Sequence, residues 1–183
     1  MNDFVFSYPT RVYFGQGTAA KALEAELPRV GKTVMLAYGG GSLKATGVYD
    51  QMIALLTKAE KEIVEFSGIM PNPTYAKVQE GAALARQRHV DFILAVGGGS
   101  VIDCCKIVSV QAKRSEDIWQ REFVDHKLPT DGIPMGAVVT ASGCLAGDLS
   151  NLSTFSKMQN GGSFAMIVSL ICHHSTPFLP SMP

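Results

Sequence analysis

The stretch that decides the fold reads Ala95-Val96-Gly97-Gly98-Gly99-Ser100-Val101-Ile102-Asp103. The apolar run at 91–96 is short enough to be a strand buried on both faces. We expect a helix to begin at Val101, directly after the glycine segment, and to continue to about Ala112. This order places the glycines at the carboxyl end of a parallel strand, where open α/β sheets bind their ligands.

This segment has the chemistry of a pyrophosphate-binding loop. Glycine lets backbone N–H groups approach a phosphate with no Cβ in the way. The helix N-terminus adds partial positive charge and Ser100 adds a hydroxyl. The alternative is a glycine-rich turn needed only for close packing. Asp103, within the first helical turn, could complement the helix N-terminus, order the loop or face a substrate, with Lys106 as its partner on the same face.

The same arrangement occurs earlier in the chain. The apolar run at 33–38 leads into Gly39-Gly40-Gly41-Ser42, where the adenosine ribose of a dinucleotide would lie in folds of this class. No Asp or Glu occurs between Val34 and Leu43 to accept from a ribose 2′-hydroxyl. A 2′-phosphate would meet small residues, the Ser42 hydroxyl and the charge of Lys44. The pattern favours NADP, with NAD as the alternative.

The remaining segments alternate between strands and helices. Phe4–Phe6 and Arg11–Phe14 predict an N-terminal β-hairpin, and later strands are expected at 63–66 and 133–139. Helices are expected at 18–27, 48–58 and 75–88, the last one after the turn Pro71-Asn72-Pro73-Thr74. The order predicts a Rossmann-like, doubly wound α/β fold with a mostly parallel sheet.

A third wall of the site is expected where the strand at 133–139 ends. Thr140 and Ser142 offer two hydroxyls there, and a plain strand-end turn is the alternative. After about Leu145 the pattern deteriorates. We therefore expect a dinucleotide-binding domain over 1–145 and an atypical, irregular or disordered tail over 146–183. The apolar run at 164–172 has no cap, and no element is assigned to it.

Composition narrows the class of protein. The 183 residues are 46% hydrophobic, and 16 basic residues balance 16 acidic ones. Nothing steers the chain toward nucleic acid or anionic lipid, and there is no secretory signal pattern and no membrane-spanning run. A globular cytoplasmic protein is expected. The four cysteines lack a Cys-x-x-Cys pair and are expected to be buried free thiols, and adjacent His173 and His174 are a poor metal site.

Several of these motifs, taken in order, resemble the iron-containing alcohol dehydrogenases. The resemblance is carried by Gly97–Asp103 with Lys106, by Pro71–Thr74, by Phe14-Gly15-Gln16-Gly17 and by Tyr38–Ser42. It extends from about residue 4 to residue 143. The loop at Tyr38–Ser42 is similar to that of the butanol dehydrogenase and NADP-dependent aldehyde reductase branch. Glycerol-1-phosphate dehydrogenases and dehydroquinate synthases share the glycine loop but fit the other motifs less well.

The resemblance implies a function and a set of site residues. It implies hydride transfer between a primary alcohol or aldehyde and a nicotinamide dinucleotide bound by an N-terminal Rossmann-like domain. It also implies a helical domain in which one aspartate and three histidines hold Fe²⁺ or Zn²⁺, and it is consistent with a homodimer. The expected cofactor-binding residues are Gly39, Gly40, Gly41, Ser42, Asn72, Gly97, Gly98, Gly99, Ser100, Asp103, Thr140 and Ser142.

Two departures from the family pattern bear on activity. The chain reads Gly143-Cys144-Leu145-Ala146-Gly147-Asp148 where a Gly-Ser-Glu-like segment is usual, and the Leu-Asp-Pro stretch with the metal-binding aspartate is missing. We therefore expect a truncated nucleotide-binding half with no catalytic or metal residues of its own and little activity alone. A non-catalytic nucleotide-binding remnant is the alternative.

Overall fold

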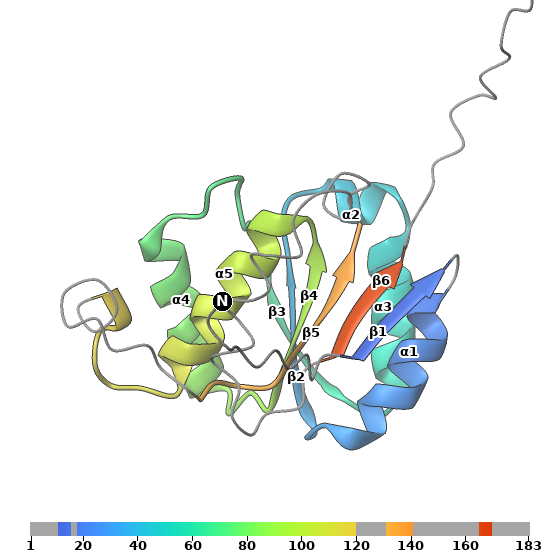
Figure 1. Ribbon diagram of the computed structural model, residues 1–183, viewed down its shortest axis with the longest axis horizontal. Helices are drawn as coiled ribbons and strands as arrows, with labels where there is room; N and C mark the ends of the chain where they lie inside the picture. The colour runs from blue at the N-terminus through green and yellow to red at the C-terminus, as the bar shows by residue number, and fades with distance from the viewer. Residues whose placement is uncertain (1–10, 16–17, 120–130, 141–164, 170–183) are drawn as a thin grey trace, which may run out of the picture.

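The computed structural model describes residues 11–15, 18–119, 131–140 and 165–169. Within them, six strands form one sheet in which every neighbouring pair is parallel, in the order β1-β6-β5-β4-β2-β3 (Figure 1). The strands are β1 (Arg11–Gly15), β2 (Thr33–Tyr38), β3 (Glu62–Phe66), β4 (Phe92–Gly97), β5 (Met135–Val139) and β6 (Ala165–Ser169). The predicted parallel α/β fold is confirmed.

Helices cover both faces of the sheet, and each face has its own apolar core (Figure 1). Along β2 the side chains of Val34 and Leu36 join one core and those of Met35 and Ala37 join the other. This is why the strand reads as a continuous apolar run. The helices are α1 (Thr18–Glu26), α2 (Ser42–Ala45), α3 (Val48–Lys58), α4 (Tyr75–Gln87) and α5 (Gly99–Ala112), with a short 3₁₀ turn η1 (Leu27–Arg29).

The order of the strands places the two glycine segments side by side. From β2 the chain passes through α3 to β3, at the edge of the sheet, and then returns through α4 to β4 on the other side of β2. Tyr38, the last residue of β2, is paired in register with Val96 of β4. The topological switch point of the sheet therefore lies between β2 and β4, and both glycine segments begin there.

Most predicted boundaries lie within a few residues of the observed ones. The strand at 33–38 and the helix at 48–58 have the predicted ends. Helix α5 begins at Gly99, two residues earlier than predicted, because Gly98 is extended (φ −89°, ψ −169°) and caps the helix. The single turn α2 was not predicted, because a glycine run carries no helical period.

Strand β6 lies in a region where no helix or strand is predicted from the sequence. Ala165–Ser169 lies between β1 and β5 and is parallel to both. Residues 4–6 lie outside the described residues, so the N-terminal hairpin stays a prediction, as does the division into 1–145 and 146–183. None of the described helices is long and apolar enough to cross a bilayer. Cys104 and Cys105 are buried free thiols, as predicted.

Candidate functional site

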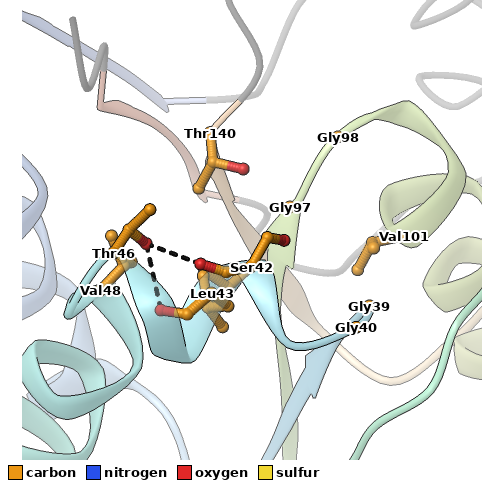
Figure 2. Close-up of a pocket in the computed structure, with 11 residues that line it drawn as sticks. Gly39, Gly40, Ser42, Leu43, Thr46, Val48, Gly97, Gly98, Val101 and Thr140 are labelled. Carbon is orange, nitrogen blue, oxygen red and sulfur yellow. Dashed lines mark hydrogen bonds between the residues drawn. The ribbon is translucent and has the colours of Figure 1, made fainter. Parts of the chain in front are cut away.

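A cleft opens at the switch point, at the carboxyl ends of β2, β4 and β5. Figure 2 shows its lining residues, which come from both glycine segments, from the start of α3 and from the end of β5. Its cavity volume is about 260 Å³. The lining residues are Gly39, Gly40, Ser42, Leu43, Thr46, Val48, Val96, Gly97, Gly98, Val101 and Thr140.

The turn after β4 needs glycine at its first position. Gly97 has φ +157°, and a Cβ there would lie 2.7 Å from Cγ2 of Val101. Gly98 then caps α5, and its carbonyl accepts from the N–H groups of Val101 (3.1 Å) and Ile102 (3.2 Å). The N–H groups of Gly99 and Ser100 come before these first helical bonds, so this end of α5 carries the partial positive charge of a helix N-terminus.

Hydrogen bonds from two residues that follow β3 hold the turn after β2 in place. The Gly68 N–H donates to the Gly39 carbonyl (3.0 Å) and the Ile69 N–H donates to the Tyr38 carbonyl (3.3 Å). A Cβ at Gly39 would lie 3.1 Å from the Ile69 carbonyl oxygen, so the approach is close. The turn then continues into α2, with Gly41 as its N-cap.

Two threonines, Thr46 and Thr140, form part of two walls of the cleft. The Thr46 hydroxyl donates to the carbonyls of Ser42 and Leu43, both at 3.1 Å, and so holds the end of α2 (Figure 2). On the other side, the Thr140 N–H donates to the Gly97 carbonyl at 3.1 Å. This bond places Thr140 beside the β4 turn.

None of the described residues that line the cleft has a charged side chain. The described lining consists of glycine backbone, the hydroxyls of Ser42, Thr46 and Thr140, and apolar side chains, with the N-terminus of α5 at one side. Such a site suits a ligand whose phosphates are bound by backbone N–H groups and whose other parts contact apolar walls.

The structure separates the predicted cofactor-binding residues into groups. Six of them line the cleft: Gly39, Gly40, Ser42, Gly97, Gly98 and Thr140. Gly41 caps α2, Gly99 and Ser100 are the first residues of α5, and none of the three is among the lining residues. Ser142 lies outside the described residues. The sequence did not single out Leu43, Thr46, Val48 and Val101, because apolar and hydroxyl side chains after a glycine run carry no special signal.

Asn72 and Asp103 are placed away from the lining of the cleft. Asn72 has a left-handed backbone (φ +53°) in the loop between β3 and α4. Asp103 lines a second cavity with Pro73, Tyr75, Val78, Cys104, Ile107, Ile118 and Trp119. The Nζ of Lys106 lies 3.0 Å from Oδ1 of Asp103, which is the predicted pair. A role for Asn72 or Asp103 in cofactor binding stays a prediction.

An acidic residue beside the β2 turn is not among the predicted site residues. Glu65, on β3, accepts hydrogen bonds from the hydroxyls of Tyr38 (2.7 Å) and Tyr49 (2.8 Å). The two hydroxyls lower the pKa of Glu65, and burial together with the Glu65 bond raises the pKa of Tyr38 to about 12. The stretch without a carboxylate, residues 34–43, covers β2 and its turn, whereas Glu65 lies on the neighbouring strand β3. The available signal was an acidic residue inside the apolar run of the neighbouring strand.

The described residues do not form a metal site. They contain no cluster of three or more His, Cys, Asp or Glu side chains that could hold an ion. The residues described here therefore do not fit the metal that the family resemblance implies, and no chemical step is assigned to one.

The fold and the cleft together define a class of protein. A parallel sheet covered on both faces, with glycine turns and a helix N-terminus at its switch point, is the architecture of dinucleotide-binding domains. The sequence model of the family "Iron-containing alcohol dehydrogenase" matches residues 9–169. The chain belongs to this family.

Individual relatives agree with that assignment. A probable NADH-dependent butanol dehydrogenase 1 of Bacillus subtilis is 44% identical over 140 residues, which are 76% of this chain and 36% of the relative. The NADPH-dependent aldehyde reductase YqhD of Escherichia coli is 41% identical over 142 residues, again 76% of this chain and 36% of the relative. The chain thus spans little more than a third of the length of these relatives.

Solved structures show the same fold. The crystal structure of the NADH-dependent butanol dehydrogenase A of Thermotoga maritima superimposes with a TM-score of 0.78 at 33% identity. The match covers 92% of this chain and 44% of that one. The cofactor-free aldehyde reductase of E. coli superimposes with a TM-score of 0.71 at 32% identity, covering 91% of this chain and 44% of that one.

Proposed function

We propose that the cleft binds a nicotinamide dinucleotide. The pyrophosphate would lie at Gly97–Ser100, on the N-terminus of α5, and the adenosine ribose over Gly39–Ser42, with Thr140 as a further wall. The observation that carries this proposal is the meeting of two glycine turns and one helix N-terminus at the switch point, in a cleft whose described lining residues are all uncharged.

We propose NADP as the preferred cofactor. The names of the relatives are divided, since the B. subtilis protein is called NADH-dependent and the E. coli protein NADPH-dependent. Support for NADP comes from the described residues of the lining, which include no carboxylate but do include the Ser42 hydroxyl beside the expected ribose position. A carboxylate in the lining would repel a 2′-phosphate.

For the whole protein we propose reversible reduction of an aldehyde to a primary alcohol. A hydride leaves C4 of the reduced nicotinamide for the carbonyl carbon, and the carbonyl oxygen takes up a proton. The described residues would hold the dinucleotide and fix the position of its nicotinamide ring.

Calorimetric titration of the 183-residue chain with NADP⁺ and NAD⁺ tests cofactor binding. We expect saturable binding that favours NADP⁺ and is lost in Gly98→Val, because a branched side chain would occupy the phosphate position. The far-UV circular dichroism of the variant must match that of the parent chain. If the parent chain binds neither nucleotide, the proposal is wrong.

A kinetic assay addresses turnover by the chain alone. We expect little aldehyde-dependent oxidation of NADPH, with or without added Fe²⁺ or Zn²⁺, because the described residues form no cluster that could hold the ion. Nucleotide binding without turnover would favour the non-catalytic binding module. Robust metal-dependent turnover would contradict it and would locate a metal site among the remaining residues.

A further inference from the structure

Four side chains beside the β2 turn form one fixed cluster. The Lys44 ammonium lies over two aromatic rings, 4.7 Å from the ring centre of Tyr49 and 5.8 Å from that of Tyr38. The rings meet edge to face, with centroids 5.5 Å apart at 64°. Glu65 accepts the hydroxyl hydrogens of both tyrosines. Glu65 therefore holds both ring hydroxyls, the two rings pack edge to face, and Lys44 lies over the rings.

The cluster is attached to the wall where the adenosine ribose is expected. Tyr38 directly precedes Gly39, and Lys44 lies two residues after Ser42 in the single turn α2. Gly39 and Ser42 both line the cleft. The N-terminus of α5, proposed to bind the pyrophosphate, lies across the cleft from this wall. A dinucleotide extending from α5 toward β2 would bring its ribose 2′-position to the side that carries Lys44.

The ammonium of Lys44 is held in place without using its hydrogen-bond donors. Within the described part of the chain, Lys44 contacts aromatic faces and forms no hydrogen bond or close ion pair, and its charge is also attracted to the nearby Glu65 carboxylate. Both oxygens of Glu65, the neighbouring carboxylate, accept from phenol hydroxyls. Because ring faces hold the cation, its three N–H donors stay available to an incoming anion.

We propose that Lys44, docked on Tyr38 and Tyr49, binds the 2′-phosphate of NADP and sets the preference for NADP over NAD. Tyr49 is a positioning residue that acts by supplying the ring face, and Glu65 fixes that ring through its hydroxyl. The inference rests on the proposed nucleotide site and adds the group that distinguishes the two cofactors. The described residues that line the cleft are uncharged, and Lys44, which directly follows the lining residue Leu43, supplies the positive charge for the 2′-phosphate.

Titration of the full chain with NADP⁺ and NAD⁺ tests the role of Lys44. In Lys44→Met the affinity for NADP⁺ should fall about tenfold while that for NAD⁺ stays within about twofold. Lys44→Arg should keep the preference, because a guanidinium also stacks on aromatic faces and binds phosphate. Lys21→Met, which removes an exposed positive charge from α1, is the matched control and should change neither affinity.

Two substitutions at Tyr49 separate its ring from its hydroxyl. Tyr49→Phe keeps the face under Lys44 and should retain the preference for NADP⁺. Tyr49→Leu removes the face and should weaken NADP⁺ binding about fivefold, with NAD⁺ little changed. A purely structural role of Tyr49 would instead lower both affinities together. Added salt should weaken NADP⁺ binding more in the parent chain than in Lys44→Met.

The outcomes distinguish this inference from the proposed function. If Lys44→Met leaves NADP⁺ binding unchanged, or weakens both nucleotides equally, the inference is overturned and the nucleotide site stands. If the parent chain binds neither nucleotide, the proposed function fails and the inference fails with it. Thermal unfolding shows whether each variant is folded, and Lys44→Gln replaces Lys44→Met if the latter is not.

Discussion

The segment Gly-Gly-Gly-Ser occurs twice in this chain, and the two copies form different turns. After β4, Gly97 has a positive φ, Gly98 caps the helix and the 14-residue α5 begins at Gly99. After β2, the same four residues pass through backbone with no positive φ and end in α2, a single helical turn of four residues. Identical sequences therefore have different local structures because their neighbours differ.

The glycines of the two segments are also needed to different degrees. A Cβ at Gly97 would lie 2.7 Å from Val101, whereas a Cβ at Gly40 or Gly41 would have no neighbour within 4 Å. In the segment after β4, Gly97 is required by the fold itself. In the segment after β2, the space around Gly40 and Gly41 is open to solvent or ligand. A requirement for glycine at these two positions would therefore come from ligand binding.

The largest expected effect is that of Gly97→Ala. The added Cβ meets Val101 in a backbone conformation that favours glycine, so the free energy of unfolding should fall by about 2 kcal/mol or more. Urea denaturation followed by circular dichroism measures this. Val101→Ala in the same chain removes the clashing methyl groups and should restore part of the loss. A loss below about 0.5 kcal/mol would mean that the two segments tolerate side chains equally.

The next expected effect concerns Tyr38 and Val96, the residues that directly precede the two glycine segments. Tyr38 is titratable, and Val96, its partner in register, is not. Because folding raises the pKa of Tyr38 from 10.0 to about 12, its contribution to stability is complete below pH 10 and is lost as the pH rises toward 12. Between about pH 9 and about pH 11 this loss amounts to ~1 kcal/mol.

Tyr38→Phe isolates that contribution. Urea denaturation at several pH values should give a shallower alkaline decline for the variant, while the other tyrosines titrate in both proteins. Equal slopes for the two proteins would show that Tyr38 does not respond to the pH change.

A third effect tests the hydroxyl that holds α2. Thr46→Val removes the two hydrogen bonds to the carbonyls of Ser42 and Leu43 and should lower the free energy of unfolding by about 1 kcal/mol. It should also weaken NADP⁺ binding, since Thr46 lines the cleft. Thr46→Ser keeps the hydroxyl and should resemble the parent chain. If Thr46→Val and Thr46→Ser were destabilised equally, the loss would come from the changed shape of the side chain and not from the hydroxyl.

The smallest expected effect is that of Gly41→Ala. Gly41 has φ −67° and ψ −13°, which alanine adopts without strain, and a Cβ there would meet nothing. We expect a gain of about 0.5 kcal/mol in the free energy of unfolding, from the reduced freedom of the unfolded chain, measured by urea denaturation. A clear loss of stability would remove the proposed difference between the two segments.

The sequence predicted the parts of the fold whose signal is local. Buried runs such as Thr33–Tyr38 and helical periods such as Val48–Lys58 are complete within a few residues, and their ends agree with the structure. The meeting of the two glycine turns followed from the rule for switch points. The start of α5 was placed two residues late because only the extended backbone of Gly98 defines it.

The parts that could not be predicted depend on contacts between distant elements. Lys44, Tyr49 and Glu65 come from α2, α3 and β3, and their spacing along the chain does not predict that they are in contact. Strand β6 is only five residues long and lies in a stretch without a clear period, so its place in the sheet comes from its partners.

The position of β6 has a consequence for synthesis on the ribosome. Strand β1 is made first, yet its neighbour in the described sheet is β6, made about 150 residues later. Until residues 165–169 leave the exit tunnel, β1 lacks that neighbour and one edge of β5 is open to pairing with other chains. The four strands from β2 to β5 can associate earlier, because each already has its neighbour. Assembly of this sheet should therefore begin at its β2–β4 centre and finish at β1, the strand translated first.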